Sequence, residues 1–406
     1  MNQPHIAIID DGINEKLYAT GELKCNIQIT PEGNICERAG YDTFMPSHGT
    51  TCAAIIKKYI PDVILSSVKV LDQDTHAGNK CQLINALQWC MQNGIKLVNL
   101  SLGTVDFRDF AHIEKAAGYF AENGGIIVAA CNNRNIFTCP ASLENVIGVR
   151  CDLSKTLKER EFIYNPASPD GIEIIACGSH HLVKYNSKST LTTRSNSFAA
   201  PAVTSMVYDI LINDKNISIN KLKEVLQEKS YKLMNTKDFT SGLSEFNEPS
   251  AVVNKSVDIP IILIYQYTVG KSNELPRTLT EKFRTDGYNA LNVEDELQQD
   301  ICKGVISLVN FTKNNDISIE RSLPSLVNVF EPDILIISIN MRKQFSQLKG
   351  IENHFEPDIK IKVEKDLITI QSTNELNGNS EFRRFKYLKE YSIDNMYQYI
   401  LSLYGK

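Results

Sequence analysis

Short, nearly continuous apolar segments alternate with longer segments of helical periodicity along the first third of the chain. A nearly continuous apolar segment predicts a strand buried on both faces of a parallel sheet. Apolar residues at helical spacing, followed by glycine, predict a helix that ends at that glycine. This alternation predicts an α/β fold with a doubly wound parallel sheet. The predicted strands span residues 5–12, 63–71, 95–103 and 126–133, and the predicted helices span residues 81–94 and 110–125.

Three polar residues fall at or just past the carboxyl ends of predicted strands. They are Asp10, Asn99 and Asn132. Because ligands bind at the carboxyl ends of the strands in open α/β sheets, we expect the functional site at this edge.

The pattern changes in residues 235–257, which are polar and weakly periodic and therefore predict a linker. A second, smaller α/β pattern follows. We expect one domain over residues 1–245 and an accessory α/β domain over residues 258–406. In the accessory domain, the predicted strands span residues 259–267 and 333–339, and the predicted helices span residues 279–288 and 393–406.

Composition narrows the class of protein. The 406 residues suffice for two domains, and contents of 42% hydrophobic and 22% charged residues are ordinary for globular proteins. The net charge of −5 and the lack of a basic stripe argue against a nucleic-acid partner. No apolar run reaches the length of a membrane span and the first residues do not resemble a signal peptide, so no membrane partner is expected.

The ten cysteines include no C-x-x-C pair. We expect reduced thiols, most of them small buried apolar residues, in a cytoplasmic protein. Cys177, His180 and His181 together suggest a metal site, but no fourth ligand follows at a recognisable spacing, so a plain loop is the favoured interpretation. No metal or cofactor is expected.

Residues 194–203, RSNSFAAPAV, place one serine among small residues ahead of a proline. The pattern suits the start of a buried helix, and it also suits the nucleophile of a hydrolase. A serine hydroxyl is a weak nucleophile at neutral pH, so it needs a base, an acid that orients the base, and donors for the oxyanion. His48 precedes a glycine and a helical segment, and Asp10 ends the first strand, so both are candidates. Catalytic triads occur in this Asp…His…Ser order.

Four motifs in this order, AIIDDGI, SHGTTCAAII, VAACNN and SNSFAAPAV, resemble those of the subtilisin family of serine peptidases. The resemblance extends over residues 4 to about 230 and implies a subtilisin-like fold and an intracellular serine endopeptidase. It implies that Ser197 is the nucleophile, His48 the general base and Asp10 the residue that orients the base. It also implies that the Asn132 side chain and the Ser197 backbone N–H stabilise the oxyanion.

The segment NLSLGT, residues 99–104, resembles the strand with which this family pairs an extended substrate. The chain departs from the family pattern at Ser195 and Asn196, where glycine and threonine are usual, and at Phe198, where methionine is usual. Cys131 replaces a glycine beside the primary specificity pocket, so we expect a small or unbranched residue before the scissile bond. The implied substrate-binding residues are Ser101, Leu102, Gly103 and Cys131.

The first catalytic strand begins within the first ten residues, so we expect no inhibitory propeptide. A peptidase without one must be restrained by narrow specificity, which favours a dedicated peptide or protein substrate. The arrangement resembles peptidases that remove the leader from ribosomally made, modified peptides. A precursor peptide is therefore the expected partner.

Residues 264–274 end in Gly270-Lys271-Ser272, which resembles the end of a phosphate-binding loop. Such a loop needs a glycine at the position of Tyr265. Asp333 begins a predicted strand instead of ending one, so it is poorly placed to hold magnesium. We therefore expect the accessory domain to recognise substrate. Two alternatives stay open, a catalytically weak peptide-binding subunit and a nucleotide-regulated partner subunit.

Overall fold

The computed structural model describes residues 3–72, 75, 77–166, 168, 170–230, 259–267, 274–309, 319–342, 355–365, 367–372, 382–386 and 390–404. The chain divides into two compact units, Met1–Asn247 and Glu248–Lys406. The predicted linker, residues 235–257, lies outside the described residues, as does Gly270-Lys271-Ser272.

The described part of the first unit contains a nine-stranded sheet in the order β3-β2-β4-β1-β5-β6-β7-β9-β8. All neighbouring strands from β2 to β9 pair in parallel, and only the edge strands β3 and β8 pair antiparallel. The strands are β1 (His5–Asp10), β2 (Cys25–Ile29), β3 (Ile35–Glu37), β4 (Ile64–Lys69), β5 (Leu97–Leu100), β6 (Ile126–Ala130), β7 (Ile147–Cys151), β8 (Phe162–Tyr164) and β9 (Ile174–Ala176). A separate hairpin joins β10 (His181–Val183) and β11 (Ser189–Leu191).

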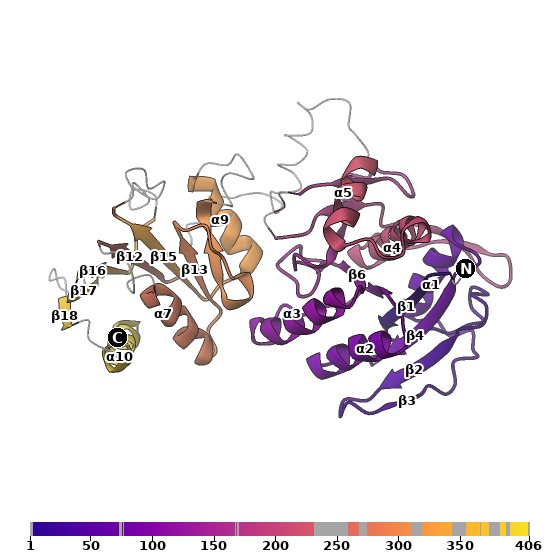
Figure 1. The fold of residues 1–406 in the computed structure, drawn as a ribbon, viewed down its shortest axis with the longest axis horizontal. Coiled ribbons are helices and arrows are strands. Elements are labelled where there is room, and N and C mark those ends of the chain that lie inside the picture. The colour runs from indigo at the N-terminus through magenta and orange to yellow at the C-terminus, as the bar shows by residue number, and fades with distance from the viewer. Residues whose placement is uncertain are drawn as a thin grey trace. The chain divides into compact units, whose positions relative to one another are not determined.

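Helices cover this sheet on both faces (Figure 1). Ile6 and Ile8 of β1 share one core with α1, α4 and α5, whereas Ala7 and Ile9 are equally buried and point to the opposite face. Helices α2 and α3 pack against each other. The predicted α/β fold with a doubly wound parallel sheet is confirmed. The helices are α1 (His48–Tyr59), α2 (Lys80–Gln92), α3 (Phe107–Glu122), α4 (Asn196–Asn213) and α5 (Ile219–Lys229).

The third predicted strand, residues 95–103, is shorter in the structure than in the prediction. Its sheet part, β5, ends at Leu100, and residues 101–103 leave the sheet. These residues instead line a cleft.

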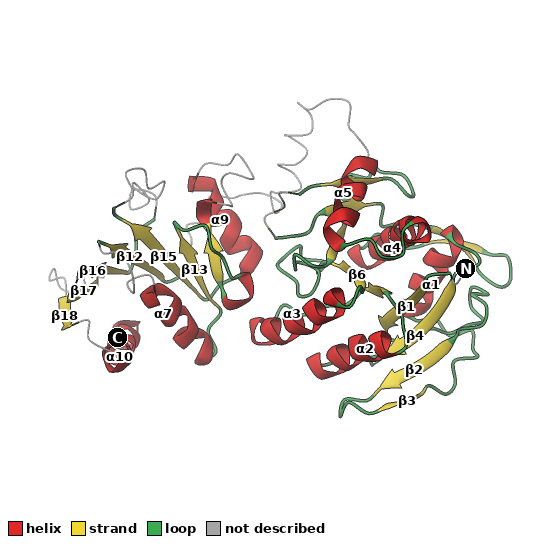
Figure 2. Ribbon diagram, viewed as in Figure 1, coloured by secondary structure: helices red, strands yellow, loops and turns green. Residues whose placement is uncertain are grey.

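The second unit is also α/β (Figure 2). Its described residues form a seven-stranded sheet in the order β14-β13-β15-β12-β16-β17-β18, parallel from β14 to β16 and antiparallel beyond. The strands are β12 (Ile261–Gln266), β13 (Ala290–Glu294), β14 (Val305–Ser307), β15 (Ile334–Asn340), β16 (Ile359–Val363), β17 (Leu367–Ser372) and β18 (Phe382–Lys386). The helices are α7 (Glu274–Thr285), the 3₁₀ helix η2 (Ile301–Lys303), α9 (Ile319–Phe330) and α10 (Glu390–Tyr404).

The position of Tyr265 argues against a phosphate-binding loop. This residue lies within β12, and its side chain is 7% exposed in an apolar core. A phosphate-binding loop places its first glycine after the strand, where the backbone can curl around phosphate. Asp333 directly precedes β15, at the opposite end from the carboxyl edge.

No helix in the described ranges combines the length and the apolar character that crossing a bilayer requires.

Candidate active site

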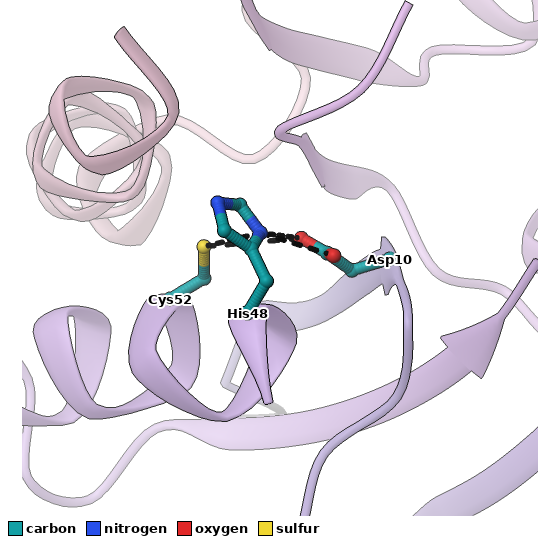
Figure 3. Close-up of side chains that lie close together, drawn as sticks. All are labelled: Asp10, His48 and Cys52. Atoms are coloured by element: carbon teal, nitrogen blue, oxygen red, sulfur yellow. Dashed lines mark hydrogen bonds and ion pairs between the residues drawn. The ribbon is translucent and has the colours of Figure 1, made fainter. Parts of the chain in front are cut away.

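Two candidate residues come from neighbouring elements at the carboxyl edge of the first sheet. Asp10 is the last residue of β1, and His48 is the first residue of α1. Asp10 Oδ2 lies 2.8 Å from His48 Nδ1 and accepts its hydrogen bond (Figure 3). The side chain of Asp10 is 1% exposed and that of His48 is 26% exposed. Because Nδ1 carries the proton in this bond, Nε2 is the nitrogen that can act as a base.

Backbone contacts hold the start of α1 against the end of β1. Asp11 accepts hydrogen bonds from the N–H groups of His48 at 2.9 Å and Gly49 at 2.8 Å. A carboxylate at a helix N-terminus is also favoured by the helix dipole. A Cβ on residue 49 would lie 2.8 Å from the carbonyl oxygen of Gly12. Glycine is therefore required for the two elements to approach this closely.

The protonation of His48 depends on its two closest neighbours. Burial lowers the pKa of the imidazole, but interactions with Cys52 and Asp10 outweigh burial and raise this pKa above its ordinary value. Burial also raises the pKa of the Cys52 thiol, so this thiol is neutral at neutral pH. The carboxylate of Asp10 is therefore the charge that stabilises the protonated imidazole.

Ser197 lies at the start of α4, as the second residue of that helix. Its backbone N–H is one of the first four of the helix, which have no acceptor within the helix. Ser101 Oγ donates a hydrogen bond of 2.9 Å to the Ser197 carbonyl oxygen. The ring of Phe198 stacks on the His48 ring, with the centroids 5.2 Å apart. The first turn of α4 is thus fixed against both the base and residue 101.

One cleft brings the three predicted catalytic residues together. Its volume is about 520 Å³, and Asp10, His48 and Ser197 all contribute to its lining. The hydrogen bonds of the described residues do not include one between Ser197 Oγ and His48, and such contacts often form only when substrate binds. The remaining lining residues are Val70, Leu71, Ala77, Gly78, Asn79, Lys80, Leu83, Ser101, Leu102, Gly103, Thr104, Asp109, Ile113 and Asn133.

The predicted oxyanion donor, Asn132, and its neighbour Asn133 differ in how their side chains lie. Asn132 is absent from the cleft lining, and its side-chain oxygen accepts a hydrogen bond of 2.7 Å from the Arg134 N–H. Its carbonyl oxygen accepts one of 2.9 Å from Asn196 Nδ2. The Asn132 side-chain oxygen therefore closes a local turn, and the Asn133 side-chain oxygen accepts a hydrogen bond of 3.4 Å from the Asn196 N–H. Asn133 is exposed and lines the cleft together with Ser197.

Cys131 is likewise placed outside the cleft lining, unlike Ser101, Leu102 and Gly103. It is 3% exposed, and its Sγ lies 3.6 Å from the carbonyl oxygen of Ile136. The side chain of Cys131, one of the predicted substrate-binding residues, is therefore buried in the protein.

Cys52 was not predicted as a site residue; it follows His48 by four residues on α1. Its Sγ lies 3.9 Å from both His48 Nδ1 and Asp10 Oδ2 (Figure 3) and 3.4 Å from Ser101 Oγ. Residues four apart share a helix face, so the spacing in HGTTC could have indicated this contact. Asp10, His48 and Cys52 are close enough to share a metal ion, which would compete with the Asp10–His48 hydrogen bond.

The loop with Cys177, His180 and His181 supports the start of α4. Both ring nitrogens of the fully buried His180 are engaged, with Tyr59 OH at 2.8 Å and the Phe198 carbonyl oxygen at 2.9 Å. The Cys177 thiol bonds to a carbonyl of its own loop, and His181 is exposed in β10. These contacts agree with a structural loop.

Comparisons with known proteins agree with this geometry. Residues 2–250 match the subtilase family. Subtilisin DY from Bacillus licheniformis is 23% identical over 253 residues, which cover 59% of this chain and 87% of the relative. Alkaline elastase YaB from Bacillus sp. (strain YaB) is 26% identical over 248 residues, which cover 59% of this chain and 62% of the relative.

Among solved structures, the epidermin leader peptide processing serine protease from Staphylococcus aureus is 16% identical, with a TM-score of 0.41. The match covers 56% of this chain and 69% of that chain. The family match, by contrast, extends over well over half of the chain and contains every residue of the cleft. The chain therefore belongs to the subtilase family and is a serine endopeptidase.

Proposed function

We propose that this subtilase hydrolyses peptide bonds with Ser197 as nucleophile, His48 as general base and Asp10 as the residue that orients the base. The proposal rests on the hydrogen bond of 2.8 Å between Asp10 and His48, in a cleft that Ser197 also lines. These residue types perform acyl transfer in serine peptidases.

In the proposed reaction, His48 Nε2 takes the Ser197 hydroxyl proton as Ser197 Oγ attacks the substrate carbonyl carbon. The Asp10 carboxylate stabilises the imidazolium that forms. His48 then protonates the leaving amine, which breaks the peptide bond and leaves an acyl-enzyme. Water, activated by the same base, hydrolyses the acyl-enzyme and restores the Ser197 hydroxyl.

The oxyanion of this reaction would be held by the Asn133 side-chain amide and the Ser197 backbone N–H. Asn133 supports this role because it is exposed beside Ser197 in the cleft lining. The Ser197 N–H supports it because a helix N-terminus offers unpartnered donors and a favourable dipole.

The substrate would lie in extended form along Ser101, Leu102 and Gly103. These residues line the cleft directly after β5 and belong to no strand of the sheet. Their backbone groups are therefore suited to pair with a peptide, as in other β-strand additions.

Hydrolysis of a short chromogenic peptide tests the triad. Ser197→Ala should lower kcat by roughly 10⁴-fold or more, and His48→Ala by a similar factor, because the groups act as a unit. A Ser197→Ala protein that retains near-wild-type kcat would exclude Ser197 as the nucleophile. Circular dichroism of each variant serves as the control for folding.

We also propose a dedicated peptide or protein substrate in the cytoplasm, with removal of a leader from a precursor peptide as the specific form. None of the ten cysteines, all of which the structure describes, forms a disulfide, in keeping with a reducing compartment. The second unit supports substrate recognition, since the proposed catalytic residues all lie in the first unit.

The breadth of cleavage tests this specificity. After incubation of a cell lysate with wild-type or Ser197→Ala protein, new protein N-termini can be identified by mass spectrometry. A dedicated peptidase should create few sites that the Ser197→Ala protein does not. Abundant cleavage across unrelated proteins would instead indicate a digestive enzyme and would leave the triad assignment untouched.

A further inference from the structure

The outer strands of the second sheet, β16, β17 and β18, have two unlike faces. On one face, Ile359, Ile361 and Val363 of β16 belong to a core that also contains residues of α7 and α10. Successive residues of a strand point to opposite faces, so Lys360 and Lys362 point to the other face. Helix α9 packs on that other face of the sheet, but among the described residues its core includes none from β16, β17 or β18.

Cations gather on this second face of the three strands. Strand pairing places Arg384 of β18 opposite Thr369 of β17, which lies opposite Lys362 of β16. Lys386 follows Arg384 by two residues and therefore shares its face. Lys362, Arg384 and Lys386 are exposed. The basic face, as we call it, comprises Lys360, Lys362, Arg384 and Lys386, and the sequences of the three strands contain no aspartate or glutamate.

Strand β18 forms one edge of this sheet (Figure 1). Among the described strands it pairs with β17 alone, so alternate residues direct backbone N–H and C=O groups away from the sheet. Lysine and arginine on an edge strand commonly serve to prevent aggregation. Lys360 and Lys362, however, lie on β16, two strands inside the edge. Protection of the edge therefore does not account for the basic face.

The opposite face of β18 has a different character. Phe385 packs against the core beneath α10. The guanidinium group of Arg383 lies over the rings of Phe385 and Tyr399, at 5.3 Å and 5.1 Å from their centroids. A strand added beside β18 would therefore meet cations on one face and aromatic rings on the other. Such an edge suits a segment in which acidic and apolar residues alternate.

We infer that β18 binds an extended segment of the substrate by strand addition, and that acidic and apolar residues alternate in this segment. Its backbone pairs with the open edge, its carboxylates face Arg384 and Lys386, and its apolar side chains lie beside Phe385. Strand addition recognises a polypeptide backbone, which favours a peptide over a nucleic acid as the occupant of this basic edge. The inference rests on the proposed role of the second unit in substrate recognition, and it names the chemistry of the segment recognised.

Binding to full-length Ser197→Ala protein tests the inference without cleavage. The probes are two short fluorescent peptides, one of alternating glutamate and valine and one of alternating glutamine and valine, followed by anisotropy. The glutamate peptide should bind about tenfold more tightly, because opposite charges on neighbouring strands attract. This difference should shrink as salt is added. Equal affinity for the two peptides, or no binding of the glutamate peptide, would overturn the inference.

Two variants of neighbouring residues, both made in the Ser197→Ala protein, test which face of β18 is used. Arg384→Glu should weaken binding of the glutamate peptide by about tenfold, because it replaces an attraction across the strands with a repulsion. Arg383→Glu is the matched control, with the same change of charge on the opposite face, and should weaken binding by less than about threefold. Equal weakening by the two variants would overturn the assignment to the basic face. Lys386→Glu should act like Arg384→Glu and replaces it if circular dichroism shows that Arg384→Glu is unfolded.

A single-stranded oligothymidine, used as a third probe, tests the other class of occupant. It should bind more weakly than the glutamate peptide, and tighter binding would overturn the inference in favour of a nucleic acid.

Hydrolysis of a short chromogenic peptide by the otherwise unchanged chain separates the inference from the proposed function. Arg384→Glu should leave this hydrolysis unchanged, because the short peptide has no acidic segment. Hydrolysis by a chain that does not bind the glutamate peptide overturns the inference and leaves the proposed function standing. Binding of the glutamate peptide by a chain that hydrolyses no chromogenic peptide overturns the proposed function instead.

Discussion

The role of His48 depends on its protonation, because only the neutral imidazole can take the Ser197 proton. Burial lowers the pKa of His48, but Cys52 and Asp10 together raise it above the ordinary 6.5. A base with a raised pKa becomes neutral only at higher pH. The kcat/KM for a short peptide should therefore rise with pH along a limb whose midpoint lies above 6.5. A limb centred at or below 6.5 would show that Cys52 and Asp10 do not outweigh the effect of burial on the His48 pKa.

Substitutions of Asn133 and of its neighbour Asn132 test which of the two side chains stabilises the oxyanion. If its amide stabilises the oxyanion, Asn133→Ala should lower kcat by roughly 10² to 10³ with little change in KM, because the contact forms only in the transition state. Asn132→Ala is the matched control, since this side chain closes a turn away from the cleft lining. Steady-state kinetics of both variants checks this, and a larger loss for Asn132→Ala would restore the original assignment.

The sequence predicted Asp10, His48 and Ser197 as the triad because their motifs occur in a recognisable order, and all three line one cleft. The motif placed the oxyanion donor at Asn132, and among the described residues Asn133 is the one that lines the cleft. The proposal of Asn133 rests on the cleft lining and on the hydrogen bond that the Arg134 N–H donates to Asn132 Oδ1 in a local turn. Such a turn depends on the local backbone and has no unique sequence signature.

At the scale of elements, the meeting of β1 and α1 determines the distance between Asp10 and His48. A Cβ on Gly49 would lie 2.8 Å from the Gly12 carbonyl oxygen and 3.1 Å from Asp10 Cβ. Gly49→Ala should therefore push the helix start away from the strand end and lower kcat by about tenfold or more, since misplacement by an ångström can cost 10²-fold.

Gly118→Ala, inside α3, is the matched control for Gly49→Ala. The nearest atom to its new Cβ would be Asn145 Nδ2, at 3.6 Å, which is an ordinary contact. Replacing glycine by alanine in a helix interior stabilises the folded protein by about 1 kcal/mol, so this variant should have a slightly higher melting temperature. Its activity should not change. Equal kinetic effects of the two substitutions would rule out the proposed role of Gly49.

The elements with strong periodicity were predictable, and the weakly patterned ones were not. The alternation of apolar segments with helical segments that end at glycine predicted six elements, which are β1, β4, β5, β6, α2 and α3. In contrast, β7 contains Arg150, a residue that argues against a buried strand. Its guanidinium group is buried in an ion pair with Asp170, twenty residues later in the chain, so only the tertiary structure explains this strand.

At the scale of the whole molecule, stability should not depend on disulfides. None of the ten cysteines is paired in this way, and most are buried, as expected for small apolar side chains. The melting temperature and the activity should therefore be the same with and without a mild reductant. A clear fall in melting temperature under reductant, measured by calorimetry, would place the protein in an oxidising compartment instead.

The most direct test of the central claim is covalent labelling of the nucleophile in the full chain. A small fluorophosphonate should modify wild-type protein at one serine, and peptide mapping by mass spectrometry should identify it as Ser197. Labelling should disappear in Ser197→Ala and slow strongly in His48→Ala, because the base activates the hydroxyl group. Modification that maps to another serine, or that persists at full rate in His48→Ala, would contradict the assigned triad.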